Sequence, residues 1–81
     1  MRRAIELYGL LKETGFGSQV ELDLPEHSTA ADAMKALKAV FKDKASLLDG
    51  AALASEEAVI TPGEALPEHG RLAVLPPVCG G

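Results

Sequence analysis

The residues best suited to a chemical reaction lie at the end of the sequence, in the segment Pro76-Pro77-Val78-Cys79-Gly80-Gly81. The two glycines have no Cβ, so they could enter a channel that is too narrow for any other residue. The two prolines fix φ and remove amide donors, which makes a stiff stem. The free carboxylate that we expect on Gly81 is inert toward nucleophiles until its oxygen belongs to a good leaving group, as in an acyl-adenylate. The segment therefore predicts an arm whose tip is activated inside another protein.

A frayed C-terminus is the alternative interpretation of the same segment, because terminal residues are often disordered and glycine is common there. The stiff stem directly after an apolar stretch favours the arm. If extended, the six residues after Leu75 would reach roughly 20 Å.

The rest of the sequence offers no second centre for chemistry. His27 and His69 lie far apart, in polar loop contexts and without the spacing of metal ligands, so we expect both at the surface. The single cysteine cannot form an internal disulfide, and no glycine-rich phosphate-binding motif occurs. The sequence therefore predicts no metal site, no cofactor bound by this chain and no catalysis by the chain alone.

The composition narrows the range of partners. Twelve acidic residues against eight basic ones make a net charge of −4, which argues against nucleic acid and against anionic membrane surfaces. A basic protein partner would instead be attracted. The N-terminus lacks the apolar core of a signal peptide and no stretch is long enough to span a bilayer, so we expect a cytoplasmic protein.

Two segments of alternating polarity open the chain. In residues 3–8, Ile5 and Leu7 fall on one face and Tyr8 falls on the other. Residues 19–24 alternate in the same way, and glycines lie between the two segments. The pattern predicts two half-buried strands that form a β-hairpin.

A helix is predicted from Thr29 to about Lys42. Thr29 and Asp32 have the spacing of a capping box, which marks a helix N-terminus. Apolar residues then recur at helical spacing and form one stripe, which consists of Ala33, Met34, Leu37, Val40 and Phe41.

After the helix the pattern weakens. Leu47 and Leu48 indicate a turn with both apolar side chains directed inward, and residues 51–54 fit either a short strand or an irregular crossing. Residues 57–61 predict a short strand. Residues 71–75 are apolar on both faces, as expected of an interior strand rather than an edge strand.

These elements fit one compact α+β architecture. The last strand would pair in parallel beside the first, and the helix between them would cover one face of the sheet. We therefore predict a ubiquitin-like β-grasp fold, with a mixed sheet of four to five strands and one main helix at about residues 29–42. Residues 1–75 would form a single domain, and residues 76–81 a flexible tail.

The tail resembles the P-P-V-x-G-G end of the small subunit of molybdopterin synthase, the MoaD type of ubiquitin-like sulfur carrier. The resemblance extends to Leu11-Lys12-Glu13 after the first strand, to Thr29 at the helix start and to Gly70 before the last strand. Arg71 departs from that pattern, because the family often has an acidic residue after this glycine.

The resemblance implies a function without catalysis by the chain itself. An E1-like enzyme would adenylate Gly81 with ATP and Mg²⁺, and a sulfur-relay protein would supply sulfur for a thiocarboxylate there, with Gly80 beside it. The tail would then enter the large synthase subunit, in a heterotetramer, and donate sulfur to the precursor of the molybdenum or tungsten cofactor.

We expect partners to contact the tail and the sheet face away from the helix. The predicted contact residues are Pro76, Pro77, Val78 and Cys79 of the tail, with Tyr8, Val59, Ile60 and Leu75 of the sheet. Cys79 has two interpretations: a small residue tolerated in its position, or a thiol that exchanges with the terminal thiocarboxylate during sulfur loading.

Other functions remain open at this point. One is a ThiS-like carrier for thiamine or another sulfur-containing product, although the thiamine carriers typically lack the Pro-Pro-Val stem. Another is a ubiquitin-like modifier, in which Gly81 would form an isopeptide bond with a lysine. A third is a plain interaction domain with an incidental tail.

Overall fold

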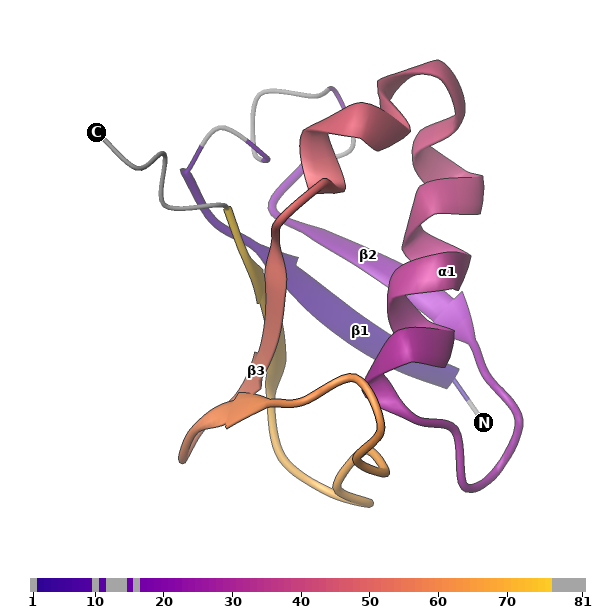
Figure 1. Cartoon of the computed structure of the whole chain (residues 1–81), viewed down its shortest axis with the longest axis vertical. Helices are drawn as coiled ribbons and strands as arrows, with labels where there is room; N and C mark the ends of the chain where they lie inside the picture. Colours follow the sequence, from indigo (N-terminus) through magenta and orange to yellow (C-terminus); the bar gives the residue numbers. More distant parts are fainter. Residues whose placement is uncertain (1, 10, 12–14, 16, 77–81) are drawn as a thin grey trace.

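The computed structural model describes residues 2–9, 11, 15 and 17–76, and Figure 1 shows their arrangement. The described part is a five-stranded mixed sheet, ordered β2-β1-β5-β3-β4, with α1 packed across one face. The elements are β1 (Arg2–Leu7), β2 (Gln19–Asp23), α1 (Ala30–Phe41), the 3₁₀ helix η2 (Lys42–Leu48), β3 (Ala52–Ser55), β4 (Val59–Ile60) and β5 (Leu72–Leu75). This is the predicted β-grasp architecture.

The first two strands form the predicted antiparallel hairpin. Ile5 pairs with Val20, and the next core position pairs Arg3 with Leu22. Ile5 is fully buried and Leu22 is 4% exposed, whereas Glu21 between the inward positions is exposed. The period-2 alternation of the sequence therefore places one face of the hairpin in the core.

The helix α1 begins at the predicted capping box. The Asp32 backbone N–H donates to Thr29 Oγ1 at 3.3 Å, and the Thr29 backbone N–H donates to Asp32 Oδ2 at 2.9 Å. These bonds satisfy donors that the first helical turn leaves open. The buried face of α1 consists of Ala30, Ala33, Leu37 and Phe41, while Met34 and Val40 of the predicted stripe are partly buried.

The last strand, β5, lies at the centre of the sheet. It pairs in parallel with β1, Ile5 opposite Leu72, and antiparallel with β3, Leu53 opposite Val74. Leu72 and Val74 are 1% and 0% exposed. Each such aliphatic side chain contributes about 1.5–3 kcal/mol by its burial. The apolar composition of both faces of this segment is explained by its interior position.

Two local predictions after α1 are corrected by the structure. Residues 42–48 form the 3₁₀ helix η2, where a turn was expected only around Leu47 and Leu48. Leu48 is 1% exposed, whereas Leu47 is 42% exposed. Consecutive residues of a 3₁₀ helix point about 120° apart, so both side chains cannot face the core. The strand predicted over 57–61 is shorter, and only Val59 and Ile60 pair with β3.

The long loop between β4 and β5 is tied to the start of α1. Ala30 N–H donates to Glu64 O at 3.0 Å, and Ala31 N–H donates to Pro62 O at 3.0 Å. Leu66 of the same loop is 8% exposed and joins the core. These contacts attach the loop to the N-terminal end of α1.

Candidate functional site

The segment predicted to form the arm begins where β5 ends. Leu75 is the last residue of β5, and the half-buried Pro76 follows it. Because β1 and β5 are parallel, their carboxyl-terminal ends lie at the same end of the sheet. Leu7 pairs with Val74 there. The predicted reactive residues Gly80 and Gly81, with Pro77, Val78 and Cys79, lie outside the described residues.

Gly9 lies directly against the root of the arm. A Cβ built on Gly9 would lie 2.9 Å from Cγ of Pro76, and Gly9 has a φ of +61°. The carbonyl oxygen of its neighbour Tyr8 accepts a hydrogen bond from Leu11 N–H at 3.2 Å, which closes a turn after β1. The exit of the arm is therefore in contact with the end of β1.

The sheet face opposite α1, which we call the open face, is apolar and built largely from small residues near this exit. The pairs Ala52–Leu75 and Ala54–Ala73 place these side chains on the face that Leu53 and Val74 do not occupy. Tyr8 and Val59 are exposed, at 39% and 55%. Alanines leave the backbone close to the surface, so a partner could approach the strands closely. Exposed apolar surface of this kind is typical of an interaction site.

The structure corrects the predicted position of Ile60. Ile60 pairs with Leu53, which pairs with Val74, and all three side chains therefore lie on the helix side. Ile60 is 8% exposed and part of the core. Side chains alternate along a strand, so a one-residue difference in register exchanges the two faces. Of the predicted sheet contacts, Tyr8, Leu75 and Val59 are on the open face and Ile60 is not.

A charged network that the sequence did not predict borders the open face. Arg71 Nε donates to Glu6 Oε2 at 2.7 Å, and Arg71 Nη2 donates to Glu6 Oε1 at 3.0 Å. Tyr8 Oη donates to Glu6 at 3.1 Å, and the Arg71 backbone N–H donates to Glu56 Oε1 at 3.0 Å. These groups surround a shallow cavity of about 190 Å³ that also includes Ala54 and Ala73.

The network holds Glu6 in its charged form. The hydrogen bond from Arg71, followed by that from Tyr8, lowers the pKa of Glu6 below its ordinary value of 4.5. The same bond raises the pKa of Arg71. The pair therefore stabilises the charged form of both groups. The network suits recognition and alignment rather than acid–base catalysis.

The two histidines lie at the surface, as expected. His27 and His69 are both exposed, in separate loops. Across the described part of the chain, no group of three or more His, Cys, Asp or Glu side chains is close enough to hold a metal ion. Within the same residues, no helix combines the length and the apolar character that a membrane span requires.

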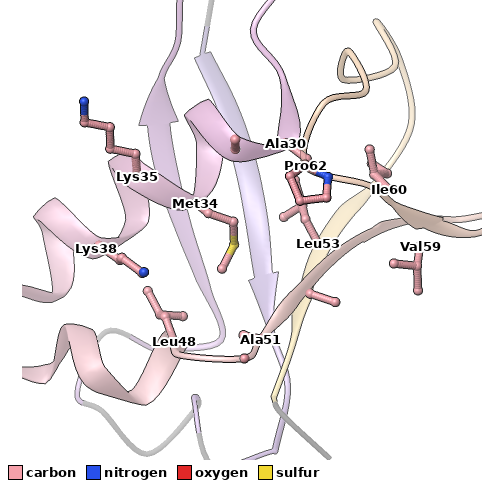
Figure 2. Close-up of a pocket in the computed structure, with 13 residues that line it drawn as sticks. Ala30, Met34, Lys35, Lys38, Leu48, Ala51, Leu53, Val59, Ile60 and Pro62 are labelled. Atoms are coloured by element: carbon pink, nitrogen blue, oxygen red, sulfur yellow. The ribbon is translucent and has the colours of Figure 1, made fainter.

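A larger groove of about 480 Å³ lies on the helix side of the sheet, between α1 and strands β3 and β4 (Figure 2). Met34, Leu48, Leu53 and Ile60 are among its apolar lining residues, and Lys38 is at its mouth in Figure 2. Lys38 Nζ lies 3.7 Å from Asp49 Oδ1. Apart from Lys35 and Lys38, the groove is lined by apolar residues and glycine, so its lining could bind an apolar group.

The sequence matches a family model, described as the ThiS family, over residues 5–81. The chain belongs to the ThiS family. No curated protein matches the sequence. Members of this family are ubiquitin-like sulfur carriers or modifiers related to MoaD, and such small carriers are not catalytic by themselves. The ThiS-family match agrees with the resemblance that the tail suggested, and it extends over both the domain and the tail.

Solved structures share the fold of this chain. SAMP1 from Haloferax volcanii is 26% identical with a TM-score of 0.73, and 100% of both chains is covered. A second structure, described as H. volcanii small archaeal modifier protein 1, is 25% identical with a TM-score of 0.72 and covers 95% of this chain and 98% of its own. A Pyrococcus furiosus protein, described as molybdopterin converting factor subunit 1, is 14% identical with a TM-score of 0.69, covers 96% and 99%, and shows the shared fold alone.

Proposed function

We propose that this ThiS-family protein carries sulfur as a thiocarboxylate on Gly81 and donates it in the synthesis of molybdopterin. The observation that carries the proposal is the extent of the family match, which runs through Gly81 and so includes the Gly-Gly end together with the domain. The described residues add no second reactive centre, so the chemistry is assigned to the terminal carboxyl group.

The proposed reaction begins on a partner enzyme. A carboxylate oxygen of Gly81 attacks the α-phosphorus of ATP, held with Mg²⁺ by an E1-like activating enzyme, and pyrophosphate leaves. The outer sulfur of a persulfide on a sulfur-relay protein then attacks the acyl carbon, and AMP leaves. The resulting acyl disulfide is cleaved by a second thiolate, which attacks the relay-protein sulfur, forms a disulfide with it and releases the thiocarboxylate on Gly81. Glycine favours this attack because its carbonyl carbon has no Cβ beside it. Gly80, equally without a side chain, would let the tip enter a narrow channel.

The open face supplies the surface on which such partners would dock. Ala52 and Ala73, which are partly exposed, allow close approach to the strands, and Tyr8 and Leu75 lie beside the exit of the arm. A partner on this face would have Pro76 and the following residues at its edge. The overall charge of −4 favours a partner with a basic surface.

The molybdopterin assignment rests on the stem Pro76-Pro77-Val78, which resembles that of the synthase small subunit. The fold shared with the P. furiosus protein is consistent with it. In this role the tail would insert into the large subunit of the synthase, in a heterotetramer, and transfer sulfur to the precursor. A carrier for thiamine or another sulfur-containing product would use the same chemistry on Gly81 with a different acceptor.

A second candidate function is a protein modifier. It is favoured by the likeness to SAMP1, whose name describes a modifier, over the whole of both chains at 26% identity. The first step would be the same adenylation of Gly81. A lysine amine, in place of sulfur, would then attack the acyl carbon and form an isopeptide bond.

Intact mass spectrometry of the protein purified from its native host tests these proposals. A gain of about 16 Da at the C-terminus, where sulfur replaces oxygen, indicates the carrier. Conjugates of higher mass that contain a Gly81–lysine link indicate the modifier. Co-purification with a large synthase subunit would support the molybdopterin role specifically. Protein that remains unmodified in cells that are making the cofactor would contradict both functions.

A further inference from the structure

The contact between Gly9 and Pro76 joins the end of β1 to the first residue of the arm. Pro76 Cγ would lie 2.9 Å from a Cβ on Gly9, and Pro76 Cβ and Cδ would each lie 3.7 Å from it. A separation below 3.0 Å is a steric clash that real Cβ atoms do not make. The proline ring therefore occupies the space that a side chain at position 9 would need.

Proline cannot relieve such a clash by changing rotamer. Its ring is closed onto its own backbone nitrogen, so only a change of ring pucker, which displaces mainly Cγ, or a shift of the Pro76 backbone can make room. Leu75, which precedes the proline, is confined to extended conformations and is paired with Ala52 in the sheet. Because β5 is held by this pairing, a backbone shift at Pro76 would change the direction in which the chain continues from β5.

We propose that Gly9 is a positioning residue that seats Pro76 against the end of β1 and so sets the direction in which the arm leaves the domain. The inference rests on the proposed function, because it assigns Gly9 a part in delivering Gly81 to the activating site. It assigns no chemical step to Gly9. The parallel pairing of β1 with β5 brings the two residues together, although they lie at opposite ends of the sequence.

Gly9 also has a left-handed backbone conformation, which by itself favours glycine. The experiment therefore needs a control for the cost of a positive φ. Gly15 and Gly17 have φ values of +93° and +83°, and no atom lies within 4 Å of a Cβ built on either of them. Substitution by alanine at all three positions imposes the cost of a positive φ, but only Gly9→Ala also displaces Pro76. The comparison separates the effect of backbone strain from the effect of disturbing the Gly9–Pro76 contact.

The experiment measures ATP–pyrophosphate exchange by the E1-like activating enzyme of the same host, with each variant as the varied substrate. We expect Gly9→Ala to lower kcat about ten-fold or more with an unchanged KM, because the open face still docks while the carboxylate is misplaced. Gly15→Ala and Gly17→Ala should leave both constants unchanged. Pro76→Ala, which removes Cγ, should restore kcat in the Gly9→Ala background, measured as a double-mutant cycle with Pro76→Ala alone.

NMR tests the Gly9–Pro76 contact in the absence of any partner protein. We expect a nuclear Overhauser effect between Gly9 Hα and the Pro76 ring protons in the unaltered protein, and we expect shifted signals from Val78 to Gly81 in Gly9→Ala but not in Gly17→Ala. Absence of the Gly9–Pro76 contact, or equal effects of Gly9→Ala and Gly17→Ala on kcat and on the tail signals, would overturn the inference. Failure of the unaltered protein to support exchange would contradict the proposed function, while the NMR comparison would still decide the inference.

Discussion

Arg71 and Glu6 form a two-pronged ion pair across the central parallel strands, with nitrogen–oxygen distances of 2.7 and 3.0 Å. Both residues lie on the open face: Arg71 directly precedes β5, and Glu6 pairs with Ala73 within the sheet. The side chain of Arg71 is 71% exposed and that of Glu6 is 24% exposed. Exposed pairs contribute little to stability because water screens them. The pair is therefore better placed to shape the surface that a partner meets than to hold the fold together.

The first prediction concerns the pKa of Glu6. Replacing Arg71 by Met should raise this pKa toward 4.5, because the strongest hydrogen bond to the carboxylate is lost. Titration of the side-chain carboxyl carbons by NMR measures the change. Glu64 provides a control, since its lowered pKa depends on hydrogen bonds from Thr61 and should not respond. An unchanged pKa for Glu6 in Arg71→Met would show that the pair does not form in solution.

The second prediction is a loss of stability in acid. The pKa values of Glu6, Asp32 and Glu64 are all lowered on folding, by the partners Arg71, Thr29 and Thr61 respectively. A carboxyl group whose pKa is lower in the folded state stabilises that state above its unfolded pKa, and this contribution is lost as the pH falls through the folded pKa. Urea unfolding midpoints should therefore be constant near neutral pH and fall below about pH 4.

Variants identify the groups responsible for that acid response. Glu64→Gln and Asp32→Asn should each flatten the dependence of the unfolding midpoint on pH, since the neutral side chain cannot be protonated. A midpoint that is the same at neutral pH and at pH 3 in the unaltered protein would contradict the assignment of lowered pKa values.

The third prediction compares neighbouring residues of β4. Ile60→Ala should destabilise the domain by about 2–4 kcal/mol, because it leaves a cavity beneath α1. Val59→Ala should change stability by less than about 0.5 kcal/mol, because this side chain is 55% exposed on the open face. Val59→Asp, which adds a charge to that face, should raise KM in the exchange assay with the activating enzyme. Equal stability losses for the two alanine variants would contradict the observed register of β3 and β4.

The fourth prediction separates the arm from the domain. Deletion of Gly81 should abolish thiocarboxylate formation and sulfur donation while the thermal midpoint stays nearly unchanged, because the core is formed by the described residues before Pro76. Calorimetry and intact mass spectrometry measure the two effects. Cys79→Ser is a second tail variant for comparison with the deletion of Gly81. Full sulfur loading of Cys79→Ser would exclude thiol exchange at Cys79, and impaired loading would support it. A large drop in the thermal midpoint on deletion of Gly81 would instead give the tail a structural role.

Local patterns in the sequence determined most of the fold. The capping box at Thr29 and the apolar stripe of α1 predict the helix because both depend only on residues within a few positions of one another. Alternation in residues 3–8 and 19–24 predicts the hairpin for the same reason. The two-sided apolar character of residues 71–75 places them at the centre of the sheet, and the Gly-Gly end identifies the proposed reactive group without any coordinates.

The tertiary structure decided the features that depend on register between distant segments. The register between β3 and β4 decides whether Val59 or Ile60 faces the core, because a shift of one residue exchanges the two faces. A strand of only two residues is too short for its own alternation to specify that register. The Glu6–Arg71 pair and the Gly9–Pro76 contact both require the parallel pairing of β1 with β5. These contacts join residues more than sixty positions apart. Such contacts are set by how side chains pack between elements, and that packing leaves no periodic signal in the sequence.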